Sequence, residues 1–297
     1  MEMLESQETR PAFMDALDKV SKLANINSQE TDLVIVREKV EVLPLAGDEE
    51  QALKTGNITL STFIKNFNKL LFSKLKLQEN TQFKDYETFL KLLTPQDKAL
   101  LIYAFSLSSF KKLGTVGKIC EHCEQEFPVD IIPEELWHKD SAPKAWDKGE
   151  NPFDYRVPQV FLDGALEIYF KLPTEFDRIR LMDMLENNIK DNLETSGSTF
   201  SVLDTIAFFC DKIVIVDADG KGKNQELTDL TEEIFPFLHN LPAKIKDDVF
   251  DSVDLEIFDD YMPNLYQEAK CTRCHKNNKV IVNIETEFFR KAVLLFG

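Results

Sequence analysis

The sequence contains no long hydrophobic run and no excess of positive charge. Its longest apolar stretches, residues 99–105 and 292–296, are far shorter than the roughly 20 residues that a membrane-spanning helix requires. Lysine and arginine together number 35 against 52 aspartates and glutamates, which gives a formal net charge of −17. Such a charge repels phosphate backbones and anionic lipids, so binding to nucleic acid or to a membrane is disfavoured.

The motifs of common catalytic sites are also missing. The chain has no G-x-G-x-x-G, no G-K-[ST], no G-x-S-x-G and no H-E-x-x-H. It has only four histidines, so acid–base catalysis would have to rest on carboxylates, and no pair of carboxylates stands out. We therefore expect a protein that is not an enzyme and that has no small-molecule substrate.

The first residues, M-E-M-L-E-S-Q-E-T-R, lack the pattern of a signal peptide. They are acidic and do not show a basic segment followed by an apolar one. We expect a protein of the cytosol or of a particle assembled there. In that reducing environment, paired cysteines more often bind metal or perform redox chemistry than form structural disulfides.

Four of the five cysteines fall into two C-x-x-C pairs far apart in the chain, Cys120 with Cys123 and Cys271 with Cys274. This spacing is typical of a zinc knuckle, a tight turn that directs two sulfurs toward one tetrahedral ion. Each pair is followed, at the same offset, by the alternation of a strand. The apolar residues of these two strands are Phe127, Val129 and Ile131, and Val280, Val282 and Ile284. The repeated plan predicts a zinc ribbon in which the four cysteines bind one structural Zn²⁺ per chain.

Other interpretations of these cysteines stay open. A dithiol redox protein needs a reactive cysteine at the start of a helix, whereas both pairs precede strand-like alternation. His122 or His275 is an alternative ligand in place of one thiolate. Cys210, at the end of T-I-A-F-F-C, is expected to lie in the core as a small hydrophobic residue. Four cysteine ligands would leave a zinc ion no open position for catalysis, which favours a structural role.

The rest of the pattern indicates an α+β fold with a helix-rich body and short strands. Residues 1–31 are expected to form an N-terminal helical arm and linker. Its apolar face comprises Phe13, Leu17, Val20 and Leu23. A terminal segment of this kind packs either on its own body or on a partner, and both alternatives stay open.

Three further segments are expected along the chain. Residues 32–158 form a lobe that contains the first knuckle, residues 159–262 form a central α+β segment, and residues 263–297 form the second knuckle and a closing hairpin. The predicted strands cover residues 34–42, 165–172 and 213–216, and the predicted helices cover 60–71, 86–93 and 199–210. Thr94 with Pro95, and Pro173 with Thr174, mark further helix starts.

Several stretches together resemble a known family. They are V-E-V-L-P-L-A-G-D-E-E-Q-A-L-K-T, L-F-S-K-L, F-L-K-L-L-T-P-Q-D-K-A-L-L-I-Y-A-F-S, the first C-x-x-C, F-P-F-L-H-N-L-P-A-K-I, the second C-x-x-C and E-F-F-R. Over residues 32–290 the chain resembles the T-even-type bacteriophage baseplate hub protein and baseplate hub assembly protein family. The most specific element of the likeness is a knuckle after a helical N-terminal half, paired with another just before Phe-Phe.

The resemblance implies a protein of the tail baseplate of a contractile-tailed phage, without catalytic activity. It implies other baseplate, hub or tail proteins as partners, and a place in the virion or in the host cytoplasm during assembly. The extended N-terminal arm departs from the family. A zinc-ribbon adaptor in transcription or replication remains an alternative, although the negative net charge is unfavourable for it.

Overall fold

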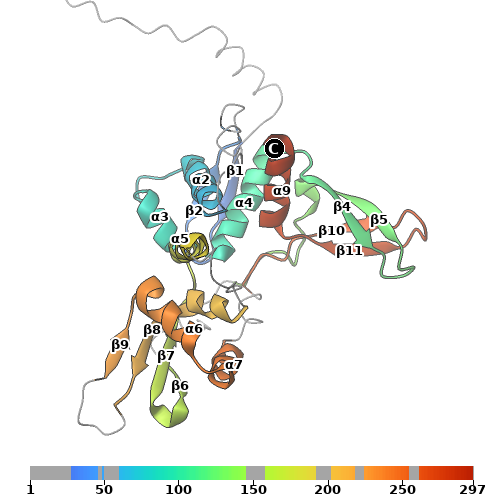
Figure 1. Ribbon diagram of the computed structural model, residues 1–297. Coiled ribbons are helices and arrows are strands. Elements are labelled where there is room, and N and C mark those ends of the chain that lie inside the picture. The colour runs from blue at the N-terminus through green and yellow to red at the C-terminus, as the bar shows by residue number, and fades with distance from the viewer. Residues whose placement is uncertain are drawn as a thin grey trace, which may run out of the picture.

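The computed structural model describes residues 28–45, 49, 60–144, 158–191, 202–217, 224–253 and 261–296 (Figure 1). It confirms the α+β class, with helices and several small antiparallel sheets. The predicted N-terminal helix with Phe13, Leu17, Val20 and Leu23 lies outside the described residues. The buried apolar side chains form two hydrophobic clusters, described in turn below.

The first cluster is organised around helix α4 (Pro95–Ser109), which is buried on nearly all sides. As predicted, Thr94 caps the helix, and its hydroxyl accepts a hydrogen bond from the Asp97 N–H at 3.4 Å. The other elements around it are α2 (Leu60–Ser73), α3 (Tyr86–Leu92), and a sheet of β1 (Gln29–Asp32), β2 (Lys39–Val42) and β3 (Leu75–Lys76). The helices predicted over residues 60–71 and 86–93 are thus confirmed.

The single strand predicted over residues 34–42 is wrong in its first half. Residues 34–36 form the turn of a hairpin between β1 and β2. The reason is the buried carboxylate of Asp97, which accepts hydrogen bonds from the backbone N–H groups of Val34, Ile35 and Val36 at 2.7, 3.1 and 2.9 Å. These three N–H groups cannot then donate to a neighbouring strand.

Two β-hairpins extend from this cluster, side by side in Figure 1: β4 (Gly114–Ile119) with β5 (Glu126–Ile131), and β10 (Tyr266–Lys270) with β11 (Asn277–Ile281). The strand predicted to continue to Ile284 ends at Ile281, and Ile284 instead begins helix α9 (Ile284–Phe296). The Asn283 side chain accepts a hydrogen bond from the Thr286 N–H at 3.0 Å, as a helix N-cap does.

The second cluster lies between a four-stranded sheet and short helices. The sheet has the order β6 (Gln159–Phe161), β7 (Leu166–Phe170), β8 (Cys210–Ile215) and β9 (Gln225–Leu227). The helices are a 3₁₀ helix (Val202–Phe209), a π-helical turn (Leu230–Ile234), α6 (Phe235–Asn240) and α7 (Ala243–Ser252). The helix predicted over residues 199–210 is thus a 3₁₀ helix, and Cys210 begins a strand.

Helix α5 (Glu175–Asp191) connects the two clusters, because Ile179 belongs to the first and Leu181 to the second. Thr174 and Asp177 cap its start through reciprocal hydrogen bonds, in agreement with the predicted helix start.

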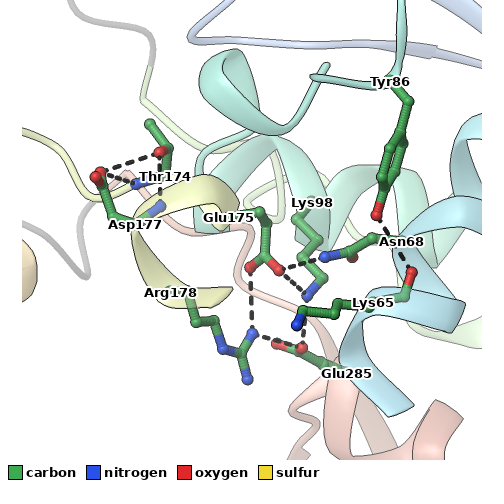
Figure 2. A network of polar contacts seen from close by, with 9 residues as sticks. All are labelled: Lys65, Asn68, Tyr86, Lys98, Thr174, Glu175, Asp177, Arg178 and Glu285. Carbon is green, nitrogen blue, oxygen red and sulfur yellow. Dashed lines mark hydrogen bonds and ion pairs between the residues drawn. The ribbon is translucent and has the colours of Figure 1, made fainter. Parts of the chain in front are cut away.

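A buried ionic network joins α5 to helices α2, α4 and α9 (Figure 2). The Glu175 carboxylate is 1% exposed and accepts hydrogen bonds at 2.8 Å from both Lys98 Nζ and Asn68 Nδ2. Lys98 also pairs with Glu285 at 3.0 Å, and Arg178 pairs with Glu175 at 3.2 Å and with Glu285 at 2.9 Å. Two cations thus meet two carboxylates, and the group is neutral as a whole. The network fixes the helix that follows the second knuckle.

Candidate metal centre

Each C-x-x-C pair forms the turn of one of the two hairpins, and the two turns have the same backbone hydrogen bonds. In the first knuckle, the Glu124 N–H donates to the Cys120 carbonyl at 2.9 Å, and the Cys120 N–H donates to the Gln125 carbonyl at 3.0 Å. In the second knuckle, the corresponding bonds from His275 and Cys271 measure 3.0 and 2.9 Å. The two turns are therefore structural copies of each other.

The residue after the second cysteine has a left-handed backbone in both copies. Glu124 has φ 59° and His275 has φ 60°. This conformation is uncommon for residues other than glycine, so its recurrence at equivalent positions is a property of the turn. The alternation that follows the first knuckle forms β5, as predicted, and Phe127, Val129 and Ile131 point into the core.

The structure brings the four predicted cysteines together. All four sulfurs lie within 4.8 Å of one another, although contacting cysteines of the two pairs are 148 and 154 positions apart in the chain. Cys120 Sγ is 3.6 Å from Cys274 Sγ, and Cys123 Sγ is 3.8 Å from Cys271 Sγ. A tetrahedral ion with metal–sulfur bonds of about 2.3 Å places its sulfur ligands about 3.8 Å apart. The cluster therefore fits one tetrahedral metal ion, and all four cysteines are free thiols.

Backbone N–H groups point toward the sulfurs. The His122 N–H lies 3.4 Å from Cys120 Sγ, and the Arg273 N–H lies 3.4 Å from Cys271 Sγ. Burial opposes ionisation of Cys120, but hydrogen bonds from the backbone of His122 and Cys123 outweigh it and lower its pKa to about 6. In Cys271 the N–H groups of Cys274 and Arg273 likewise lower the pKa. The first cysteine of each pair is thus prepared to act as a thiolate ligand.

The second cysteine of the first pair has its pKa shifted in the opposite direction. Its sulfur accepts a hydrogen bond from Gln125, but burial and the three neighbouring sulfurs raise the pKa of Cys123 to about 11. Four thiols this close cannot all ionise without a compensating positive charge. A divalent cation would supply that charge and displace the remaining protons.

No histidine joins this cluster within the described ranges, where the potential metal-binding group consists of the four cysteines. The ring Nε2 of His122 lies 3.2 Å from the Asn277 carbonyl on the other hairpin. The side chain of His275 is exposed, and its backbone provides the left-handed turn.

Two polar side chains that sequence reasoning missed join the hairpins. The buried Asn278 accepts a hydrogen bond from the Glu121 N–H at 2.9 Å and donates to the Lys276 carbonyl at 3.0 Å. The Gln267 amide accepts from the Ile132 N–H at 3.0 Å and donates to the Asp130 carbonyl at 2.8 Å. Asn278 lies on the same strand face as Val280 and Val282. A polar residue at an alternating position that is otherwise apolar was the sequence signal that could have indicated its buried role.

The fifth cysteine is remote from this chemistry. Cys210 is 1% exposed in the second hydrophobic cluster, as predicted, and burial raises the pKa of its thiol. A neutral, buried thiol is a poor nucleophile.

Comparisons of the chain with protein-family models, with curated proteins and with solved structures found no match. Among the described helices, none combines the length and the apolar character needed to cross a membrane.

Proposed function

We propose that the four cysteines bind one structural Zn²⁺ ion. The observation that carries this proposal is the convergence of four sulfurs, with separations of 3.6 and 3.8 Å between the knuckles. A tetrahedral set of four thiolates suits Zn²⁺ or iron, and a site closed by four protein ligands is typical of structural zinc. Such an ion has no open position for a substrate.

The ion would act as a crosslink between the two hairpins. Its ligands are 148 and 154 positions apart in the chain, so it would join segments that only the folded state brings together. Structural zinc in small domains contributes about 10 kcal/mol or more to folding. Much of the second hairpin's attachment to the body would then depend on the metal.

At the level of the whole protein, we propose a non-enzymatic structural or assembly component of a contractile-tailed phage baseplate, acting through protein–protein contacts. Two points support this role. First, the stretches that resemble the baseplate hub family include the residues around both knuckles. Second, the Phe-Phe pair of that resemblance, Phe288 and Phe289, packs helix α9 against the body. Their rings lie 5.1 and 4.9 Å from that of Phe67 on α2. A closed metal site suits a building block.

Metal analysis tests the zinc site. Mass spectrometry of purified protein should give one zinc per chain, and the Cys271→Ser variant should lose both the zinc and thermal stability. Cys210→Ala is the control for metal content, because it removes a buried thiol outside the cluster without burying a hydroxyl, and it should keep the zinc. The site would be refuted if the purified wild type contained no metal and had the same melting temperature as Cys271→Ser.

The assembly role needs a separate test. Wild-type protein should copurify with tail or baseplate assemblies from infected cells. Its absence from both virions and assembly intermediates would refute the role, whatever the metal content.

A further inference from the structure

The hairpin of the second knuckle is basic, although the chain as a whole has a formal charge of −17. Residues 269–281 contain no acidic residue. They contain four exposed basic side chains: Lys270, Arg273, Lys276 and Lys279. Within the described part of the chain, Lys270, Arg273 and Lys276 make no ion pair. Lys279 lies over the ring of Tyr266, with Nζ 3.7 Å from the ring centroid.

The first knuckle provides an internal control for this charge. The two turns have the same backbone hydrogen bonds, so residues at the same offset from the cysteines occupy equivalent positions in the two turns. Gln125 is equivalent to Lys276, Glu124 to His275, and Ile119 to Lys270. Glu121 pairs with Lys118 at 3.2 Å. His122 is equivalent to Arg273. A knuckle therefore forms with neither lysine nor arginine at the positions of Lys270, Arg273 and Lys276, and the architecture of the turn does not explain these side chains.

The metal cluster does not explain them either. The backbone supplies short contacts to the first sulfur of each pair: the His122 N–H lies 3.4 Å from Cys120 Sγ, and the Arg273 N–H lies 3.4 Å from Cys271 Sγ. The basic side chains face solvent on a hairpin that projects from the body (Figure 1). Unpaired charge on a rigid, projecting element is suited to recognition.

An exposed apolar residue lies beside this charge. Ile281 is 76% exposed, and it shares one face of β11 with the exposed Lys279 and Asn277. Lys270 lies opposite Asn277 across the hairpin, and Tyr266 lies opposite Ile281. One acidic residue, Glu268, lies opposite Lys279. We call the side chains Lys270, Arg273, Lys276, Lys279 and Ile281 the basic knuckle surface.

We propose that the basic knuckle surface docks an acidic segment of a partner protein that also carries an apolar side chain. The inference rests on the proposed assembly role and identifies the surface that performs it. The four cations complement a short acidic segment, and Ile281 offers an apolar contact that a phosphate backbone would not use. The exposed Glu121, Glu124 and Glu126 of the adjacent knuckle would repel a longer polyanion such as DNA. The metal cluster, Asn278 and Gln267 hold the hairpin in place, which reduces the entropy lost on docking.

Fluorescence anisotropy with two labelled probes tests this surface. One probe is a 12-residue peptide of glutamates around a central Leu-Phe pair, and the other is a 20-base-pair DNA duplex. The wild type should bind the peptide more tightly than the duplex at moderate salt, and the Arg273→Glu/Lys276→Glu variant should lose at least about tenfold in peptide affinity. The control Lys84→Glu/Lys244→Glu makes the same charge change at exposed lysines outside the hairpin and should change the affinity less than about twofold.

The comparison requires all variants to retain the metal content and the melting temperature of the wild type. If Arg273→Glu/Lys276→Glu unfolds the hairpin, the neutral variant Arg273→Gln/Lys276→Gln replaces it. Tighter binding to the duplex, no peptide binding, or an equal loss in the control would each overturn the proposal. In infected cells, normal incorporation of the charge-reversed protein into particles would refute the docking surface and leave the assembly role intact. Absence of the wild type from particles would refute the role, while peptide binding would still report on the surface.

Discussion

At the scale of single residues, Asn278 and Glu285 each join parts of the chain that are distant in sequence. Asn278 spans the two knuckles, and its side chain also helps to lower the pKa of Cys120. Glu285 connects α9 to the cations of α4 and α5. Both are polar groups in sparsely hydrated surroundings, where the loss of one partner leaves the other unsatisfied.

Replacing Asn278 by alanine should weaken the metal centre without removing a ligand. The Glu121 N–H would lose its acceptor, and we expect a loss of about 1–3 kcal/mol in the free energy of unfolding. We also expect metal affinity to fall about 10- to 100-fold, as for other groups that orient metal ligands. Melting curves and competition with a chromogenic chelator measure the two effects. Asn277→Ala, at an exposed neighbouring position, is the control, and an equal effect in it would contradict the assigned role.

We expect the ion pairs of Glu285 to contribute to the free energy of unfolding in a pH-dependent way. Burial would raise its pKa, but Lys98 and Arg178 outweigh burial and lower the pKa to about 2. Because this folded-state pKa lies below the value of about 4.5 in the unfolded chain, the contribution is present above pH 4.5 and is lost as the pH falls toward 2. At neutral pH it is on the order of 3 kcal/mol.

Urea unfolding of the wild type and of Glu285→Gln checks this contribution. The difference between them should be largest at neutral pH and should shrink as the pH falls below 4.5. Metal loss in acid affects both proteins and cancels in the difference. The control Glu87→Gln removes an exposed pair with Lys91 and should cost less than about 0.5 kcal/mol at any pH. A difference that does not depend on pH would count against the ionic role.

At the scale of elements, α9 attaches the second hairpin to the helices of the first cluster. Phe288 is fully buried, and its ring lies 5.1 Å from that of Phe67 and 5.4 Å from that of Phe105. We expect Phe288→Ala to lower the free energy of unfolding by about 3–5 kcal/mol, because it leaves a cavity among aromatic rings. Phe289→Ala, at a half-buried position, should cost clearly less. Denaturant unfolding of both variants measures the effects, and equal losses would contradict this packing.

Most helices were predictable from local signals, and the exceptions have identifiable causes. The Thr94–Pro95 start and the apolar spacing of α2 depend only on residues within a turn or two of each other. The turn at residues 34–36 depends on the carboxylate of Asp97, about sixty positions later. The end of β11 did have a local signal, since Asn283 is a good N-cap, but the alternating apolar residues favoured a strand.

At the scale of the whole molecule, we expect the two hydrophobic clusters to differ in their dependence on the proposed metal ion. The knuckle hairpins pack on the first cluster, which contains Cys120 and Cys271, whereas β7 and β8 belong to the second. Removing the metal with a chelator should therefore increase amide hydrogen exchange in β4, β5, β10 and β11 and leave β7 and β8 protected. Mass spectrometry of peptides from exchanged protein measures this, with protein reloaded with zinc after chelation as the control. A uniform increase would show that the molecule unfolds as one unit.

The sequence by itself determined the α+β class, the main helices and the identity of the four metal-binding candidates. These properties depend on apolar periodicity, helix caps and the C-x-x-C spacing, which act over a few residues. The repeated knuckle plan predicted that the two cysteine pairs meet, and the tertiary structure brings them together. Only the tertiary structure decided that Lys270, Arg273 and Lys276 make no ion pair within the described residues, and that Asn278 and Gln267 join the two hairpins. These depend on contacts between residues roughly 150 positions apart, which no local pattern specifies.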